Sequence, residues 1–458
     1  MSHPLLLRRT LSGGLAVSGA ALLLAAERNG FACDFTDLSA RVKDTATPAN
    51  NFSGNVNDLL TYTSPSTKYV RNASGVYVSG TTLRTEYDIS GNPLGGLIEE
   101  ARTNLCLRSN DFTTTWTNTN TDEPTTNNTS PSGDTDADEI AATATADQEF
   151  AIEQAFTGRT AGAVTTCSVF LKAGTRASGD AFIQLGWEAT GASSDGCFCN
   201  FNLTSGAKGT VTAYAAGTAT SAAITSEGSG WYRCVITGAI ASGTVGVFSI
   251  HFIDNISAAG KENANLTDND SVIAWGAQIE LGSFPTSPIV TAGSTVTRNA
   301  DTIRLASSAF PLGTAYTIYA NIIPQQLGST VGILQLGDGA TNMDSMDLRA
   351  FSAGTMNVKD GNVSQAGING ADGPNLAVGV SVKLAGRVAE DDFSFFIDGV
   401  EKGTDSSGTV PAAGDLDILN VGHLLSHASA FRLNGHMADL VILPRAMDNT
   451  ELGALTTL

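Results

Sequence analysis

The carboxylates with the clearest potential chemistry are spaced two residues apart, at Asp134, Asp136 and Asp138. Alternate residues of an extended segment point to one side, so these side chains would offer the hard oxygen ligands that calcium prefers. Asp344 and Asp347 form a second acidic group. The first group lacks the glycine and glutamate of an EF-hand loop. Ca²⁺ is therefore the ion that the sequence predicts, and a solvated acidic loop is the competing interpretation.

Catalytic signatures are absent from the chain. There is no Gly-x-Ser-x-Gly string running from a strand into a helix, no His-Glu-x-x-His string and no phosphate-binding P-loop. His3 lies in the N-terminal arm, and the other four histidines show no ligand-pair spacing with a carboxylate. We therefore expect no enzymatic activity. Paired carboxylates of a glycoside hydrolase leave no sequence signature, so that alternative stays open.

Side chains that alternate away from the expected core could bind sugars. An aromatic face stacks on a sugar ring, while nearby amides, carboxylates and guanidinium groups bind its hydroxyls. The competing interpretation is that Trp231 and Arg233 belong to a second packed face, and that the loop residues are solvated. The candidate glycan-binding residues are Phe198, Asn200, Trp231, Arg233, Tyr319, Asn321, Asp338, Asn342, His423 and His427.

The composition limits the possible partners. The chain has 458 residues and a formal net charge of −20, so it repels the phosphate backbone of nucleic acids and anionic membranes. Only 15% of its residues are charged and 49 are glycine, which is typical of secreted or virion-type β-sandwiches. We therefore expect neither a nucleic-acid nor a membrane partner.

Alternating apolar and polar residues predict strands. Ile183, Leu185 and Trp187 share one face, and Ile273–Ile279 contains another apolar stripe, with Gly, Ser and Asn turns between such segments. A parallel α/β sheet would need helices between the strands, and none of convincing length is present. We predict a mainly β fold: two antiparallel jelly-roll β-sandwiches in tandem behind an extended, apolar N-terminal anchoring segment.

Changes in composition along the chain predict five segments. Pro285–Pro288 and the small polar residues after it favour a linker between the sandwiches. Asp448–Glu451 predicts a capping box that opens one short helix near the C-terminus. The predicted segments are an apolar anchor (1–30), a lead-in β module (31–107), a first sandwich (108–290), a linker (291–300) and a second sandwich (301–458).

The first 30 residues differ from the rest of the chain. Arg8 and Arg9 precede the uncharged run Thr10–Ala26, which resembles the basic and apolar regions of a signal peptide. Glycines dilute the run, its cleavage signal is poor, and it is too short and glycine-rich for a membrane span. We therefore prefer a docking segment that is buried in a partner subunit or larger particle. A cleavable signal is the alternative.

Six cysteines permit disulfides, which a chain of this length does not need. Cys167, Cys197, Cys199 and Cys234 alternate in step with apolar neighbours. We therefore predict that these four are small core residues with free thiols.

Four strings, taken in order, resemble the appendage or fibre proteins of bacteriophage virions, which carry lectin-like β-sandwiches. The span 108–290 resembles a carbohydrate-binding-module-like jelly roll. The chain from Leu433 to its terminal helix resembles a concanavalin A-like, laminin G-like jelly roll. The strings are Gly96–Leu105, Gly230–Cys234, Trp275–Pro288 and Gly293–Asp301.

The resemblance implies a structural protein at the virion surface, a tail or head fibre or spike that binds host surface polysaccharide. It implies docking to other virion subunits through residues 1–30 and, by analogy with fibres, a homotrimer whose several weak sites act together. Two alternatives stay open. One is a purely structural head spike or capsid decoration protein without glycan binding, and the other is a secreted glycan-degrading enzyme with binding modules.

Overall fold

The computed structural model describes residues 29–457, with short gaps. The predicted anchor therefore lies almost entirely outside the described residues. Strands account for about 53% of the chain, and the sheets are antiparallel, which confirms the prediction of a mainly β fold. No helix among the described residues is long and apolar enough to cross a membrane. The gaps are residues 47, 64–65, 124–126, 178, 191–194, 242, 311, 328–330, 340–343, 351–352, 371–375, 413 and 425–430.

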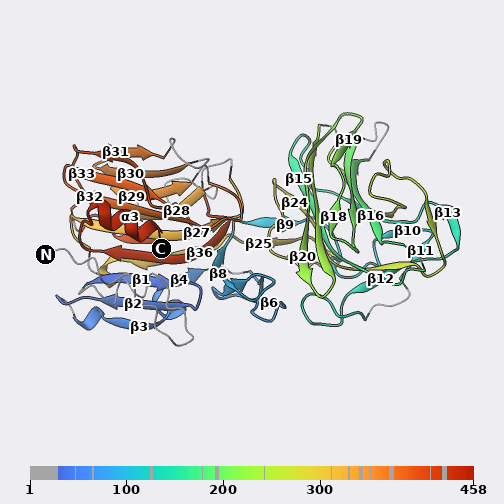
Figure 1. The fold of residues 1–458 in the computed structure, drawn as a ribbon, viewed down its shortest axis with the longest axis horizontal. Helices are drawn as coiled ribbons and strands as arrows, with labels where there is room; N and C mark the ends of the chain where they lie inside the picture. Colours follow the sequence, from blue (N-terminus) through green and yellow to red (C-terminus); the bar gives the residue numbers. More distant parts are fainter. Residues whose placement is uncertain are drawn as a thin grey trace.

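Figure 1 shows two lobes side by side. The middle lobe, residues 105–290, contains two main sheets with an apolar core between them. Its seven-stranded sheet has the order β10 (Thr117–Thr119), β14 (Ala151–Phe156), β22 (Gly246–Phe252), β16 (Phe182–Ala189), β17 (Gly196–Asn202) and β18 (Ala207–Lys208), with β19 (Thr212–Tyr214) also on β17. Its six-stranded sheet has the order β11 (Thr121–Asp122), β12 (Asp138–Ala142), β24 (Ser271–Leu281), β15 (Val164–Ala173), β21 (Trp231–Ile240) and β20 (Gly217–Gly228). A short pair, β13 (Ala146–Gln148) and β23 (Ala264–Leu266), completes the lobe.

The core of the middle lobe follows the predicted alternation. Ile183, Leu185 and Trp187 are fully buried between the sheets. All six cysteines are buried and free, which confirms the prediction of core thiols. Burial raises the pKa of Cys197 to about 12 and that of Cys199 to about 11, so neither is a reactive thiolate near neutral pH.

The terminal lobe combines strands from both ends of the chain around a second core. Its ten-stranded sheet has the order β3 (Phe52–Asn55), β2 (Ser39–Lys43), β1 (Gly30–Asp34), β36 (Gly435–Leu443), β27 (Tyr316–Pro324), β32 (Val382–Ala389), β33 (Asp392–Ile397) and β34 (Val400–Asp405). β8 (Pro93–Ile98) joins β36, and β7 (Thr85–Tyr87) joins β8. The facing sheet has the order β31 (Val363–Asn369), β30 (Gly354–Asp360), β29 (Ser345–Ala350), β28 (Val331–Gly337), β35 (Ile418–Val421), β26 (Thr302–Ala306) and β4 (Thr61–Thr63).

The strands predicted as a lead-in module thus complete both sheets of the terminal lobe. In β1, Phe31 pairs with Ile442 of β36, and Phe31 and Cys33 lie in the core. Every residue of β1 is buried, as expected for a strand covered on both faces. Part of the predicted linker is also a strand: β25 (Val296–Arg298) pairs with β9 (Arg102–Asn104) between the lobes.

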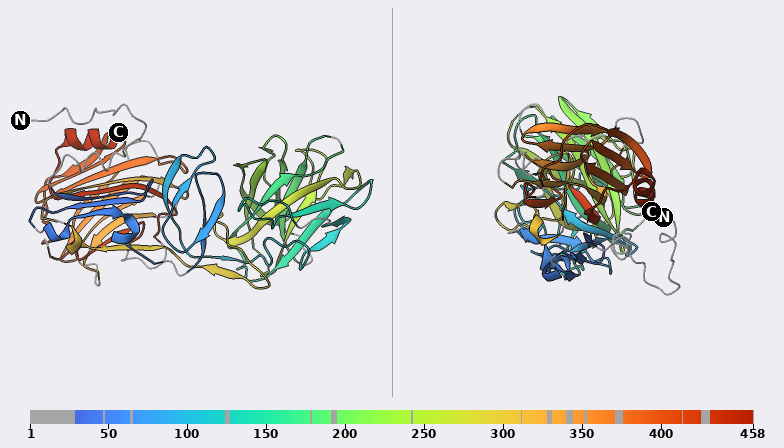
Figure 2. Two further views of the ribbon diagram at one scale, coloured as in Figure 1. Left: turned by 90° about the horizontal axis from the view of Figure 1, so that it is seen from below. Right: turned by 90° about the vertical axis from the view of Figure 1, so that its left-hand side faces the viewer.

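One short helix, α3 (Asn449–Thr457), covers the outer face of the ten-stranded sheet (Figure 2). The predicted capping box is confirmed: the Glu451 N–H donates to Asp448 Oδ1 over 2.9 Å, and the Asp448 N–H donates to Glu451 Oε2 over 3.0 Å. Leu452 and Leu455 of the helix pack with Tyr319 of the sheet. The helix therefore removes part of this face from solvent.

Candidate functional site

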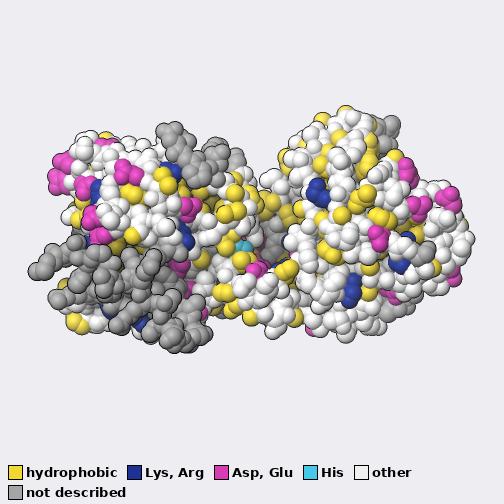
Figure 3. All heavy atoms as spheres, viewed as in Figure 1, with side chains coloured by type: hydrophobic (Ala, Val, Ile, Leu, Met, Phe, Trp, Pro, Cys, Tyr) yellow, Lys and Arg dark blue, Asp and Glu magenta, His cyan; other side chains and the backbone are white. Residues whose placement is uncertain are grey.

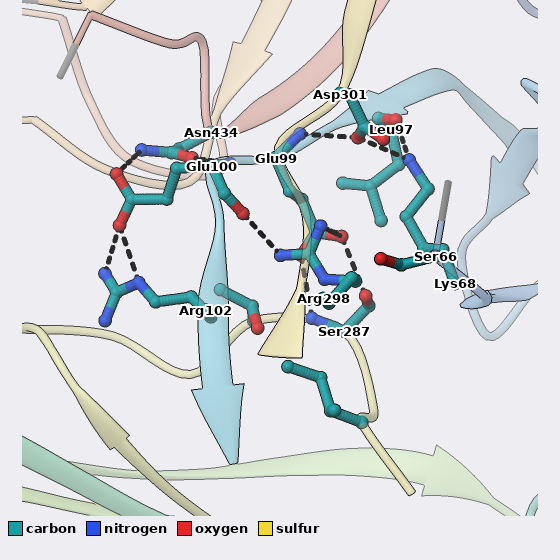
Figure 4. Close-up of polar contacts among 12 residues, drawn as sticks. Ser66, Lys68, Leu97, Glu99, Glu100, Arg102, Ser287, Arg298, Asp301 and Asn434 are labelled. Atoms are coloured by element: carbon teal, nitrogen blue, oxygen red, sulfur yellow. Dashed lines mark hydrogen bonds and ion pairs between the residues drawn. The ribbon is translucent and has the colours of Figure 1, made fainter. Parts of the chain in front are cut away.

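Buried polar groups from three of the four sequence strings, Gly96–Leu105, Trp275–Pro288 and Gly293–Asp301, join the two lobes (Figure 4). Glu99 accepts two hydrogen bonds of 2.7 Å from Ser287, one from its N–H and one from its hydroxyl. Arg298 Nη1 lies 3.4 Å from Glu99 Oε2, and both side chains are almost fully buried. A buried charge is tolerated only with such partners, so these residues hold the junction together.

Asp301 forms the second centre of the junction. It accepts hydrogen bonds from Tyr62 Oη at 2.6 Å, from Lys68 Nζ at 2.7 Å and from the Glu99 N–H at 2.8 Å. Burial opposes the charge of Asp301, but Lys68 and Arg298 outweigh it and hold its pKa below the ordinary value. Asp301 is therefore an ionised, fully partnered carboxylate.

Glu100 connects the junction to the start of β36. Arg102 Nε donates to Glu100 Oε1 over 2.6 Å, and Asn434 Nδ2 donates to Glu100 Oε2 over 3.0 Å (Figure 4). The Arg102 guanidinium also lies 4.8 Å from the centre of the Phe284 ring, in the segment that follows β24. Residues from both lobes thus fix one another, and we expect the lobes to move little relative to each other.

A hairpin of β5 (Lys68–Arg71) and β6 (Tyr77–Gly80) covers an aromatic platform on the six-stranded sheet. The ring centres of Tyr77 and Phe170 lie 5.5 Å apart, and those of Tyr69 and Trp275 lie 6.3 Å apart. Trp231 belongs to the same buried cluster. The platform is therefore closed to ligands, because a distant part of the chain packs on it.

A cleft with a volume of about 440 Å³ lies beside this hairpin, between the lobes. Figure 3 shows hydrophobic, acidic and histidine side chains close together where the lobes meet. Strands β20 and β21 supply small and hydroxyl side chains, including Ser221 and Thr225. Tyr87 and Phe284 are half-buried aromatic residues of its lining. A cleft with a few convergent polar groups at a domain interface is the default place to seek a binding site.

The lining of the cleft contains a triad that joins the β5–β6 hairpin to the middle lobe. Tyr77 Oη donates to Glu227 Oε2 over 2.9 Å, and Arg71 Nη2 donates to Tyr77 Oη over 3.0 Å. Arg71 is also ion-paired with Glu227. Burial raises the pKa of Tyr77 to about 12, although Arg71 acts in the opposite direction. The phenol therefore stays protonated and serves as a hydrogen-bond donor.

Glu86 and His436 form a second polar pair, with Glu86 Oε2 and His436 Nε2 2.7 Å apart. Burial raises the pKa of Glu86, but the hydrogen bond and the charge of His436 outweigh it, and the net pKa is lowered. Within the described residues, three nitrogen atoms of the lining have no hydrogen-bond partner: Arg71 Nε, Arg233 Nε and His436 Nδ1. The cleft thus combines neutralised charges, unmet polar atoms and aromatic edges, a set that suits a polyhydroxy ligand.

Several candidate glycan-binding side chains prove to be covered. Phe198 and Asn200 face away from the core as expected, yet both are buried. The segment Asp254–Lys261 lies over them: Asn200 Nδ2 donates to the carbonyls of Ile256 and Ala258. The prediction that these side chains are open to a ligand is wrong in this structure, because alternation identifies a face and not what covers it.

The other candidates are spread over the molecule. Arg233 lines the cleft, where its Nη2 donates to the Thr286 carbonyl over 2.8 Å. Tyr319 is buried beneath α3, and Asn321 bonds to neighbouring polar side chains of the same sheet. His423 is buried, and Asp338 is half-buried. Asn342 and His427 lie outside the described residues.

The carboxylates predicted to hold Ca²⁺ are engaged by the protein itself. Asp134, Asp136 and Asp138 do not converge; they accept hydrogen bonds from Ser132, from Asn110 and Trp275, and from the Phe112 N–H, respectively. Asp347 is ion-paired with Arg349, and Asp344 accepts from the Gly361 N–H. Throughout the part of the chain that the structure describes, no three His, Cys, Asp or Glu side chains gather as metal ligands would.

Sequence reasoning missed most of the cleft. Arg71, Glu86, Glu227 and His436 come from separate strands or strand ends, and no local spacing connects them. The four strings could have pointed to the cleft, because three of them contain residues of its lining: Glu99, Arg233 and Phe284–Pro288.

Comparison with solved structures returns several weakly similar β-sandwich proteins. A heptameric SAP-like pentraxin from Limulus polyphemus is 11% identical (TM-score 0.25, covering 31% of this chain and 70% of the pentraxin). Domain 4 of the extracellular arabinanase AbnA from Geobacillus stearothermophilus is 15% identical (TM-score 0.28; 34% and 73%). The CBM40 domain of the Ruminococcus gnavus IT-sialidase is 17% identical (TM-score 0.28; 32% and 84%).

No curated protein matches the chain. A family model does match: the concanavalin A-like lectin/glucanases superfamily, over residues 297–453. This span contains β26–β36 and most of α3, and it supplies five strands of the ten-stranded sheet and six strands of the seven-stranded sheet of the terminal lobe. Residues 297–453 are therefore similar to a concanavalin A-like lectin/glucanase domain, and strands from residues 30–98 complete the two sheets of this lobe.

Proposed function

We propose that the protein binds a glycan in the cleft between its lobes and does so at the surface of a phage-like particle. The observation that carries the proposal is the cleft itself, about 440 Å³ in volume and lined from both lobes by aromatic, hydroxyl and charged side chains. The concanavalin A-like domain beside it supports a lectin-like role. The virion location is supported by the four strings that resemble phage fibre proteins.

The cleft offers both ring surface and polar groups to a sugar. Tyr87 and Phe284 offer ring surface, and Ser221 and Thr225 offer hydroxyl groups. The guanidinium of Arg233 belongs to the lining and carries N–H groups that can donate to a sugar oxygen.

The protein is proposed to bind without cleaving. Hydrolysis of a glycosidic bond needs a protonated carboxylic acid near neutral pH, which requires a raised pKa. The pKa of Glu86 is lowered instead, and Glu227 is occupied by Arg71 and Tyr77. Neither carboxyl group is prepared to protonate a leaving group.

Attachment to a particle would supply the affinity that one site lacks. In the proposal, residues 1–30 dock the chain to other virion subunits, and several copies, three by analogy with fibres, face the host together. Weak sites on one rigid particle bind through their high effective concentration.

Binding to an array of bacterial surface polysaccharides tests the proposal. We expect the full chain to bind a subset of the array without releasing reducing ends, and Tyr87→Ala to weaken that binding roughly tenfold. Ile89→Ala is the matched control, because Ile89 is close in sequence, 52% exposed and outside the cleft lining. An intact chain that binds no polysaccharide would point to a purely structural spike or decoration protein, and released reducing ends would point to a secreted enzyme.

A further inference from the structure

The outer face of the seven-stranded sheet in the middle lobe holds carboxylates around a buried histidine. His251 on β22 is 1% exposed, and its ring nitrogens Nδ1 and Nε2 lie 3.6 Å from Glu149 and 3.4 Å from Glu153. Neither nitrogen has a hydrogen-bond partner in the described part of the chain. Glu188 on β16 points to the same face, two strands away from Glu153 on β14. The result is negative charge that the sheet itself does not neutralise.

Small side chains lie between Glu153 and Glu188 on this face. The strand register places Glu153 opposite Ser249, Ser249 opposite Gly186, and Gly186 opposite Phe198. Glu188 follows Gly186 by two residues and so points to the same face, across these small side chains from Glu153.

The ammonium group of Lys261 lies between these two carboxylates. Lys261 Nζ is 2.7 Å from Glu188 Oε1 and 3.6 Å from Glu153 Oε1. The Lys261 backbone N–H donates to Gln184 Oε1 over 2.9 Å, which ties the end of the segment Asp254–Lys261 to β16. The site is therefore already shaped around one primary ammonium.

Two aromatic residues lie beside this group of carboxylates. Tyr214 Oη donates to Glu188 Oε2 over 3.0 Å and fixes the direction of that carboxylate. The Tyr214 ring lies against the Phe198 ring, with centres 5.9 Å apart. Carboxylates beside aromatic rings form the usual protein environment for an organic cation.

We propose that this face is a second binding site, specific for the primary ammonium of a ligand such as an N-unsubstituted hexosamine, and that Lys261 occupies it in the free protein. Three carboxylates, Glu149, Glu153 and Glu188, surround a single lysine and His251, so the site keeps negative charge for a cationic ligand. This site lies on the middle lobe, shares no lining residue with the cleft and does not depend on the function proposed for it.

Lys261 is suited to being displaced. It is 37% exposed, and ion pairs of that exposure contribute little to stability. Release of its side chain therefore gives up only two partly exposed ion pairs, those with Glu153 and Glu188.

Calorimetric titration of the full chain with a fully deacetylated chitosan tetramer tests the proposal. Lys261→Ala removes the internal competitor, so we expect its Kd for the tetramer to fall roughly fivefold or more relative to the wild type. Adding Glu153→Gln and Glu188→Gln to Lys261→Ala should abolish binding. Lys208→Ala is the matched control, because it removes an exposed positive charge from the same sheet. The N-acetylated tetramer should show no gain with any variant.

A second measurement on the wild type covers the case in which Lys261→Ala does not fold. A lysine-acylating reagent is added with and without the deacetylated tetramer, and modified peptides are quantified by mass spectrometry. Displacement should raise the reactivity of Lys261 and leave that of Lys208 unchanged. Unchanged or reduced Lys261 reactivity at saturating tetramer, or a Lys261→Ala variant that binds no tighter than the wild type, overturns the proposal.

Discussion

Glu99 shows how one residue of the junction serves two lobes. Its carboxylate accepts two hydrogen bonds from Ser287 and faces Arg298, all within the buried junction. Glu99→Gln keeps the shape but removes the charge, so Arg298 loses its ionic partner in a buried setting. We expect a loss of about 3–5 kcal/mol in the free energy of unfolding, measured by chemical denaturation.

A solvent-exposed ion pair gives the reference for this measurement. Arg108 and Asp111 are 2.7 Å apart and more than one-third exposed. Arg108→Ala should cost less than about 1 kcal/mol. Equal losses for Glu99→Gln and Arg108→Ala would mean that the buried pair stabilises the protein no more than an exposed ion pair does.

The lowered pKa of His423 predicts how the free energy of unfolding depends on pH. Burial, assisted by the positive charges of Arg432 and Arg304, lowers the pKa of His423 from 6.5 to about 4. Between these values the unfolded chain binds a proton that the folded chain refuses, so stability falls as the pH falls from 6.5 to 4. The shift corresponds to about 3 kcal/mol. His423→Gln should flatten the stability curve by roughly that amount across this window, and curves of equal slope would contradict the prediction.

At the scale of elements, α3 allows the stability contributed by its N-terminal cap to be compared with that contributed by its buried leucine. Leu452 is fully buried against the ten-stranded sheet, and Leu452→Ala should cost about 2–5 kcal/mol through lost contact and a cavity. Asp448→Ala removes only the side-chain cap and should cost about 1 kcal/mol. Thermal unfolding of both variants checks the order, and a larger loss for Asp448→Ala would show that the helix is held mainly by its first turn.

The sequence was a good guide to strand faces and a poor guide to what covers them. Alternation correctly placed Ile183 and Cys197 in the core, because period two is a local property of the strand. Alternation also placed Trp231 and Tyr319 on the outer faces of their sheets. A hairpin buries Trp231 there and a helix buries Tyr319, and both come from distant parts of the chain. The partner of an outer face depends on long-range packing, which no local pattern encodes.

The same limit applies to strand pairing and to the cleft. β1 pairs with β36 across almost the whole chain, and neither strand carries a signal that names the other. Cleft residues such as Glu86 and His436 meet only after this pairing, since β8 and β7 are aligned beside β36. The terminal helix was predictable because its capping box lies within four consecutive residues.

At the scale of the whole molecule, the first and the last described strands belong to the same lobe. Strands β1–β4, β7 and β8 enter the terminal lobe first, the middle lobe follows, and β26–β36 then complete the sheets that the first strands share. In the sequence, the middle lobe is thus inserted between two parts of one sandwich, and in space it lies beside that sandwich (Figure 1). The matched superfamily span, residues 297–453, is only the second half of that sandwich.

This topology predicts how fragments behave. Residues 297–458 alone lack β1 and its core side chains Phe31 and Cys33, so they leave β36 with an unpaired edge and an open core. We expect this fragment to aggregate or remain without fixed tertiary structure, as judged by near-ultraviolet circular dichroism and size-exclusion chromatography. A chain that joins residues 29–98 to 297–458 through a flexible linker should fold, because it restores both sheets. Independent folding of 297–458, or failure of the joined chain while 105–290 folds, would show that the first strands are not an integral part of the lobe.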